Sequence, residues 1–133
     1  MLLIFAGSTD ALSAEHTSRF LVPLLRWFDP AISASTIATI HFTLRKIGHF
    51  SEYGLLALFL WRALRLSLPD KSDAMVAVFS FSIAAFFAAT DEFHQTFVPS
   101  RTASPRDVLI DCIGAAFVLA MCWALSRNRH ARA

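Results

Sequence analysis

Long apolar stretches alternate with short polar segments along this chain. Residues 74–90 contain no charged side chain, and residues 108–125 contain only Asp111. A third apolar run, residues 50–68, has charges only toward its ends: Glu52, Arg62 and Arg65. A helix of about 20 residues crosses the ~30 Å hydrocarbon core of a bilayer. The pattern therefore predicts about three transmembrane helices.

Turn and capping residues separate the expected helices. The segment SLPDKSDA (67–74) contains a proline that ends one helix and polar residues that can cap the next: Asp70, Ser72 or Asp73. SPRD (104–107) is a capping signature, with serine at the N-cap and proline in the first turn. The turn FDPAISAS (28–35) precedes a helix expected to begin at Ser33 or Ser35.

The N-terminal segment MLLIFAGSTD (1–10) holds too few apolar residues to span a membrane, and it lacks the cationic start of a signal peptide. We expect it either to enter the membrane interface or to be the remainder of a truncated first transmembrane helix. The predicted fold is all-α: a polytopic helical membrane protein, residues 1–133 as one domain, with shorter helical segments before the three spans.

Composition supports the membrane class. Hydrophobic residues make up 56% of the chain, mean hydropathy is +0.53, and the charged share of 17% is below the ~25% typical of soluble proteins. A soluble protein could bury one such helix, but three leave little chain to cover them. The net charge of +2, with its cations dispersed, argues against nucleic-acid binding. We also expect no cofactor and no metal, since the His and carboxylate spacings give only a weak metal signal.

Loop charges predict an orientation. The loop 62–73 and the tail 126–133 lie on one side of the membrane, because two spans separate them. Both are short and basic, so the positive-inside rule places them, and the C-terminus, in the cytoplasm. The polar segment 91–107 then lies at the opposite face, level with the polar part of the helix that contains residues 41–53.

Polar residues recur at helical spacing at that level. One face of the first helix carries positions i, i+4, i+8 and i+11, with a tyrosine beside them: His41, Arg45, His49, Glu52 and Tyr53. A second face carries Asp91, His94 and Gln95, and a third carries Asp107 and Asp111 one turn apart. Ionisable groups at membrane depth normally face a bundle interior and mark a functional site. We therefore expect one shared polar pocket.

These two polar segments, RKIGHFSEYGLLAL (45–58) and DEFHQTFVPSRTASPRDVLIDCIGA (91–115), resemble the VanZ-like family of small bacterial membrane proteins. The family's fixed positions are filled by Lys46, His49, Phe50, Tyr53, Asp91, Glu92, Gln95, Phe97, Pro99, Arg101, Ser104 and Asp107. The resemblance is strongest over residues 40–120. It departs at Asp111, where asparagine is expected, and at the short N-terminus.

The resemblance implies a multi-pass protein of the bacterial cytoplasmic membrane, part of the cell envelope. The family is named after a member linked to low-level resistance to the glycopeptide teicoplanin, so a role in antibiotic resistance is implied. The resemblance implies no particular enzymatic activity.

Three roles fit the polar residues. In the first, the pocket binds an anionic envelope lipid or cell-wall precursor headgroup, and arginines donate paired hydrogen bonds to phosphate or carboxylate oxygens. The ligand-binding candidates are Arg45, Lys46, His49, Glu52, Tyr53, Asp91, Glu92, Gln95, Arg101, Ser104 and Asp107, with Arg106 as a further cation. The expected partners are membrane lipids and such a headgroup, with homo-oligomerisation a further expectation.

The second role is a membrane enzyme acting on such a substrate. Its general base or nucleophile is His49 or His94, and Asp91 or Glu92 orients it. In the third role the charges pair with one another and fix helix packing. Either way, a carboxylate at this depth needs a cation, so we expect Asp91 or Glu92 to pair with a basic residue: Arg45, Lys46 or Arg101.

Overall fold

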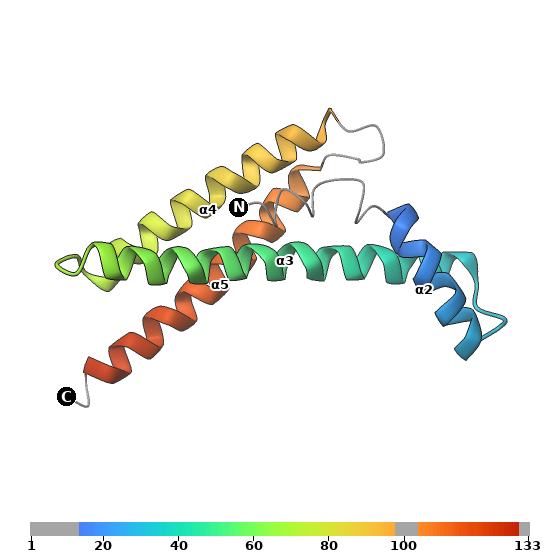
Figure 1. The fold of residues 1–133 in the computed structure, drawn as a ribbon, viewed down its shortest axis with the longest axis horizontal. Helices are drawn as coiled ribbons and strands as arrows, with labels where there is room; N and C mark the ends of the chain where they lie inside the picture. The colour runs from blue at the N-terminus through green and yellow to red at the C-terminus, as the bar shows by residue number, and fades with distance from the viewer. Residues whose placement is uncertain (1–13, 98–103, 131–133) are drawn as a thin grey trace.

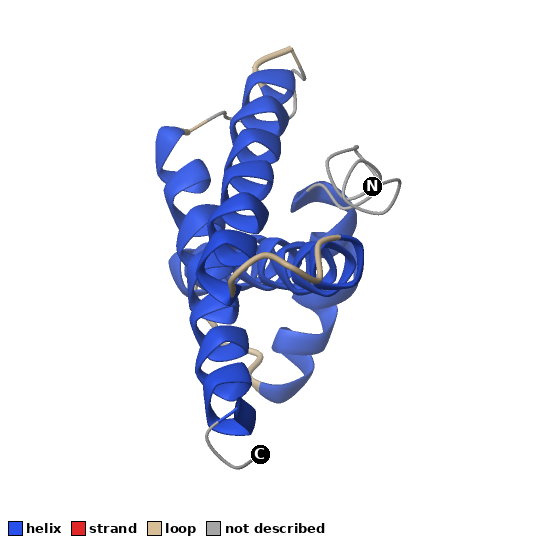
Figure 2. Cartoon of the chain, turned by 90° about the vertical axis from the view of Figure 1, so that its left-hand side faces the viewer, coloured by secondary structure: helices blue, strands red, loops and turns tan. Residues whose placement is uncertain are grey.

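The computed structural model describes residues 14–97 and 104–130, and every regular element within them is a helix (Figure 2). The helices are α2 (Ala14–Phe28), α3 (Ala34–Ser67), α4 (Asp73–Gln95) and α5 (Pro105–His130). The predicted all-α fold is confirmed for this part of the chain. The N-terminal segment 1–10, for which two arrangements were expected, lies outside the described residues.

Serine side chains begin the helices where the sequence predicted. Oγ of Ser33 accepts a hydrogen bond from the backbone N–H of Thr36 at 3.1 Å, and Ser72 accepts one from Met75 at 3.3 Å. Each bond satisfies one of the amide groups left without a partner in a first helical turn. α5 begins at Pro105, and Oγ of Ser104 accepts from the next free amide, that of Arg106, at 3.3 Å.

The long helix α3 is the axis of the molecule; α4 packs along its C-terminal part, and α5 crosses it from the level of Arg45 onward (Figure 1). α2 lies across the N-terminal end of α3. One end of the bundle joins the end of α3, the start of α4 and the last turns of α5. There Arg65 lies 3.0 Å from Asp73, which also accepts a hydrogen bond from Ser126. The functional candidates lie toward the other end, where α4 stops and α5 starts.

The inner face of each packed helix changes from apolar to polar along the bundle. On α4 the buried residues recur every three or four positions: Val76, Ser80, Ala84, Ala88, Glu92 and Gln95. Those of α5 include Asp107, Asp111, Ala115 and Leu119, and those of α3 include His49, Tyr53, Leu56, Ala57 and Trp61. The carboxylates of α4 and α5 therefore reach the interior at the same end.

Glycines let α3 and α5 approach closely just beside these polar residues. A Cβ added at Gly114 would overlap the backbone carbonyl group of Phe50, and one at Gly54 would lie 3.0 Å from a methyl carbon of Val118. Small residues at a helix crossing allow backbones to touch, as in membrane helix pairs. Gly114 has no room for a side chain, so it fixes how α3 and α5 are placed against each other.

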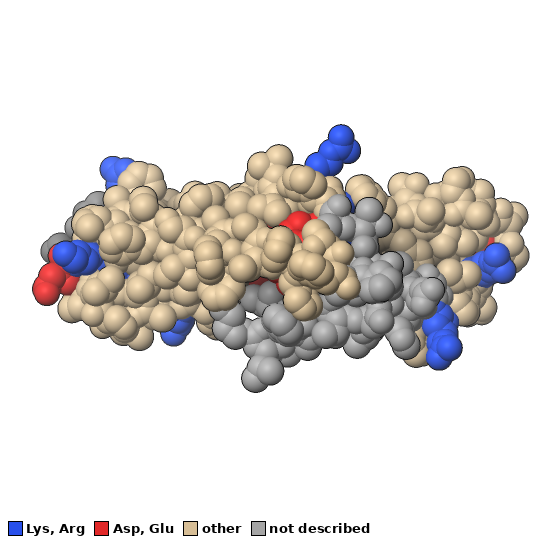
Figure 3. Space-filling view, turned by 90° about the horizontal axis from the view of Figure 1, so that it is seen from above, with Lys and Arg blue, Asp and Glu red and all other residues tan. Residues whose placement is uncertain are grey.

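Large apolar side chains lie outside rather than inside. Phenylalanines more than half exposed occur on all four helices, including Phe20, Phe42, Phe59, Phe86 and Phe117. Few charged residues interrupt the face shown in Figure 3. Two helices are long and apolar enough to cross a membrane, residues 73–95 and 105–128, and only 22% of the most apolar window of each is buried. A core helix of a soluble protein is mostly buried, so this arrangement favours lipid contact.

The prediction of a third span is wrong in this part of the chain. Residues 50–68 belong to α3, which runs unbroken for 34 residues and is not among the candidate spans. Glu52, Arg62 and Arg65 lie within the expected span, so its apolar stretch is too short and too polar. The described structure thus contains two candidate spans and one long helix packed against both.

Candidate functional site

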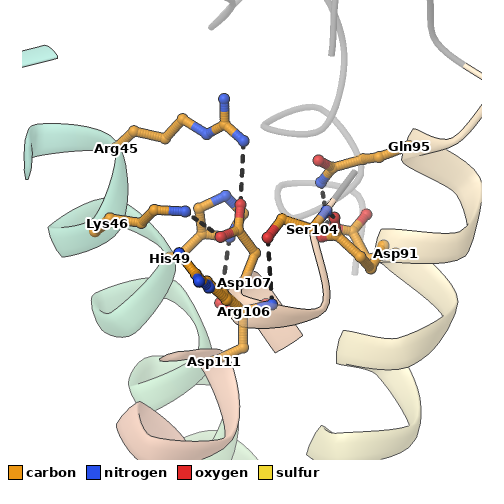
Figure 4. Close-up of polar contacts among 10 residues, drawn as sticks. Arg45, Lys46, His49, Asp91, Gln95, Ser104, Arg106, Asp107 and Asp111 are labelled. Carbon is orange, nitrogen blue, oxygen red and sulfur yellow. Dashed lines mark hydrogen bonds and ion pairs between the residues drawn. The ribbon is translucent and has the colours of Figure 1, made fainter. Parts of the chain in front are cut away.

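One buried carboxylate on α5 joins two cations of α3. Nη2 of Arg45 lies 3.1 Å from Oδ2 of Asp107, and the ammonium of Lys46 contacts the other oxygen, Oδ1 (Figure 4). The Asp107 side chain is fully buried, whereas those of Lys46 and Arg45 are 17% and 38% exposed. Two positive charges therefore share one buried negative charge, and the guanidinium reaches the surface.

One helical turn further along both helices, His49 meets Asp111. Nδ1 of the imidazole lies 3.2 Å from Oδ1 of the carboxylate, and both side chains are more than nine-tenths buried. The atoms are at ion-pair distance but are not aligned as a hydrogen bond, and neither has another hydrogen-bond partner. The nearby Asp111 carboxylate raises the pKa of His49, outweighing the opposite effect of burial.

The third wall of the site comes from the last turn of α4. Glu92 accepts a hydrogen bond from the backbone N–H of Ser104, so it ties the end of α4 to the start of α5. Nε2 of Gln95 donates to Oδ2 of Asp91 at 3.0 Å. In Figure 4 the amide of Gln95 extends from α4 toward the start of α5. Glu92 and Gln95 are buried, whereas Asp91 is half-buried.

Tyr53 lies one turn beyond His49 on α3, and its side chain is 1% exposed. Burial, together with the nearby carboxylates of Asp91 and Asp111, raises the pKa of Tyr53, so the phenol keeps its proton. Its hydroxyl has no hydrogen-bond partner in the structure, and the same is true of Oε1 of Gln95. We refer to these eight residues as the polar cluster: Arg45, Lys46, His49, Tyr53, Glu92, Gln95, Asp107 and Asp111.

The structure brings together most of the predicted site residues, but with different partners. Arg45 and Lys46 pair with Asp107, not with Asp91 or Glu92 as expected, because the start of α5 lies directly against α3. The part of that prediction that involves Arg101 lies outside the described residues. Ser104 and Asp91 lie at the edge of the cluster, and Glu52 is half-buried beside it.

Two residues, His94 and Asp111, have other positions or partners than the list of site candidates implied. His94 is exposed, since the inner face of α4 passes through Glu92 and Gln95. It therefore does not point into the cluster as a candidate base. The carboxylate that pairs with His49 is Asp111, which helical spacing placed in the expected pocket but which was not among the ligand-binding candidates.

No three His, Cys, Asp or Glu side chains of residues 14–97 and 104–130 form a group that could hold a metal ion. Cys112 and Cys122 are free thiols. The groups available for chemistry in the described site are thus two cations, a histidine beside a carboxylate, a phenol, an amide and the remaining carboxylates.

Comparison with known proteins identifies a family. A family model described as VanZ/LLP1 matches residues 1–126, which is nearly the whole chain. No curated protein and no solved structure matches it.

Proposed function

The chain belongs to the VanZ-like family, and from that premise we propose that it is a membrane protein of the bacterial envelope whose polar cluster binds an anionic headgroup. The headgroup belongs to an envelope lipid or a cell-wall precursor, and its phosphate or carboxylate contacts Arg45 and Lys46. A link to glycopeptide susceptibility, implied by the family resemblance, is part of this proposal.

The helix arrangement supports the membrane setting. α4 and α5 are long enough to cross the hydrocarbon core, and large apolar side chains cover their outer faces. The basic loop between α3 and α4 and the last turns of α5 lie together, held by Asp73. We place this end in the cytoplasm of the bacterium by the positive-inside rule, so the polar cluster lies toward the outer face of the cytoplasmic membrane.

The main support for this proposal is the excess positive charge around Asp107. Arg45 and Lys46 supply two positive charges, and the carboxylate they share supplies one negative charge, so this group of three has a net charge of +1. Arg45 uses one terminal nitrogen on Asp107, and its other terminal nitrogen points away from the carboxylate in Figure 4. A half-exposed guanidinium with free N–H groups is suited to a phosphate or carboxylate oxygen.

A binding measurement on the full chain tests this proposal. The purified protein is titrated with phosphatidylglycerol and, for comparison, diacylglycerol, which has the same tails and no phosphate. We expect preferential binding of the phosphate lipid, and a loss of several-fold with Arg45→Gln. Arg62→Gln, the same change at an exposed position of α3, is the matched control and should bind like the parent protein.

Two results would contradict the binding proposal. One is equal affinity for the two lipids. The other is a fall in thermal stability of Arg45→Gln that matches its loss of binding, because then the charges serve mainly to hold the helices together. A cellular measurement accompanies the titration: teicoplanin susceptibility of cells that produce Arg45→Gln should differ from that of cells that produce Arg62→Gln.

The contact between His49 and Asp111 favours a second candidate function, an enzyme that modifies the bound headgroup. A carboxylate beside an imidazole fixes the ring and raises its basicity, which suits a neutral imidazole to accept a proton as a general base. Mass spectrometry of lipids incubated with the protein distinguishes the two functions. A product whose formation requires His49 supports the enzyme, and recovery of unchanged lipid with full binding supports the binding role.

A further inference from the structure

Four buried polar atoms in the cluster lack a hydrogen bond of suitable geometry, although two of them, Nδ1 of His49 and Oδ1 of Asp111, lie 3.2 Å apart as an ion pair. They come from three helices: Nδ1 of His49 and the hydroxyl of Tyr53 on α3, Oε1 of Gln95 on α4, and Oδ1 of Asp111 on α5. A buried polar group without a partner costs about 1–3 kcal/mol, so such groups normally meet water, an ion or a ligand. Because these atoms belong to one cluster of side chains, they indicate a binding site for a polar ligand.

The hydrogen-bonding capacity of these atoms requires a ligand that donates hydrogen bonds. The amide oxygen of Gln95 can only accept, because its nitrogen already donates to Asp91. The ionised oxygen of Asp111 also only accepts, and the phenol of Tyr53 can accept as well as donate. A proton on His49 could satisfy Asp111 but not Gln95, which lies on another helix. A ligand with several N–H or O–H groups satisfies all of these acceptor atoms.

Charge favours a cation over a neutral donor. Among the described residues, Asp107 has two basic partners, whereas Asp111 pairs with His49 and Glu92 accepts from a backbone amide, so these two carboxylates share at most the one positive charge of a protonated His49. Both of these carboxylates are buried, and a buried carboxylate is stabilised by a nearby positive charge. A primary ammonium combines a positive charge with three donors.

We propose that the cluster recognises a zwitterionic headgroup, with phosphate at Arg45 and Lys46 and a primary ammonium at Tyr53, Gln95 and Asp111. This inference rests on the proposed function, because it places a second group of the same ligand beside the anionic one. On α5 the two subsites are one helical turn apart, at Asp107 and Asp111, whereas on α3 Lys46 and Tyr53 are about two turns apart. A phosphate and an ammonium joined by two carbons, as in phosphoethanolamine, have a separation comparable to the single turn on α5.

Two probes test whether N–H donors on the headgroup are required. Phosphatidylethanolamine and phosphatidylcholine carry the same phosphate and the same positive charge, but the trimethylammonium of choline has no N–H donor. In titrations of the full chain we expect about tenfold tighter binding of the ethanolamine lipid, as loss of hydrogen bonds to a charged group predicts. Phosphatidylglycerol and diacylglycerol complete the series.

Variants assign the preference to particular atoms. Gln95→Leu removes the amide oxygen, together with the amide nitrogen that donates to Asp91, while keeping a similar volume, and Tyr53→Phe removes only the hydroxyl. Both should lower the ethanolamine preference toward one. Arg62→Gln, at the exposed face of α3, should keep the full preference. Thermal unfolding of each variant confirms that it is folded before binding is compared.

The series separates failure of this inference from failure of the proposed function. If all three phosphate lipids bind equally and better than diacylglycerol, the phosphate subsite stands and the ammonium subsite is rejected. If none binds better than diacylglycerol, the proposed function itself fails. A preference that survives in both Gln95→Leu and Tyr53→Phe also overturns the assignment. Titration with soluble phosphoethanolamine distinguishes a free headgroup from one attached to a lipid.

Discussion

Asp107 is the residue whose removal should most perturb the site, because two cations depend on it. Asp107→Asn keeps the size of the side chain and one oxygen acceptor but removes the negative charge. Lys46 then remains 17% exposed without its carboxylate, and Arg45, 38% exposed, loses its ion pair as well. The change therefore leaves one largely buried and one partly solvated cation unpaired.

The expected cost lies between two limits. Breaking a buried ion pair costs about 3–5 kcal/mol, whereas an exposed pair contributes less than about 1 kcal/mol. Asp107 is fully buried, but water screens both of its partners in part. We therefore expect the free energy of unfolding to fall by about 2–3 kcal/mol, which corresponds to a loss of roughly 6–12 °C in melting temperature.

Thermal unfolding of the full chain in detergent measures this cost, and a double-mutant cycle assigns it to the ion pair. Lys46→Met alone should cost less than Asp107→Asn, because Arg45 still neutralises the carboxylate. The double variant should cost less than the sum of the two single variants. Asp70→Asn, the same chemical change in the exposed turn before α4, should stay within about 0.5 kcal/mol. A cost for Asp107→Asn as small as that of Asp70→Asn, or strictly additive single variants, would refute the ion-pair account.

Three further predictions follow from other parts of the structure. Gly114→Ala should destabilise the protein by about 1–3 kcal/mol in thermal unfolding, because the new Cβ meets the backbone of Phe50. Gly48→Ala, at an open position of α3, should be neutral or slightly stabilising. Equal effects of the two variants would contradict the close crossing of α3 and α5. The raised pKa of His49 means that its stabilising contribution is present below about pH 6.5 and lost as the pH rises through the higher folded-state value, so melting temperature should decline over that window and His49→Gln should flatten the decline. In a variant with both native cysteines replaced, an impermeant thiol reagent should label Thr96→Cys in intact cells and Asn128→Cys only after permeabilisation; the reverse pattern would invert the proposed orientation.

Local sequence determined the helices and their ends. Serines at positions 33, 72 and 104 precede helix starts because their side chains satisfy amide groups that the helix leaves free. Helical spacing also identified residues of the site that share a face, such as His49 and Tyr53. These features depend on contacts within one or two turns, so they can be predicted without knowledge of the fold.

Hydropathy alone did not determine the number of spans. The apolar run after Phe50 was expected to form a separate span, but it is part of a helix that begins at Ala34 and carries charges on both sides of its apolar part. The composition of a segment shows how apolar it is. Whether it lies in lipid or against neighbouring helices depends on what packs around it.

Only the tertiary structure determined which charged residues form ion pairs with one another. Asp91, Glu92, Asp107 and Asp111 are all carboxylates at the same level, and the sequence offers no reason for Lys46 to prefer one of them. The preference for Asp107, and the contact between His49 and Asp111, depend on the register of α5 against α3. That register is fixed where Gly114 meets the backbone of Phe50, because backbone contact leaves no freedom for the helices to slide. The residue types of the site are thus determined by the sequence, whereas the pairs they form depend on how the two helices cross.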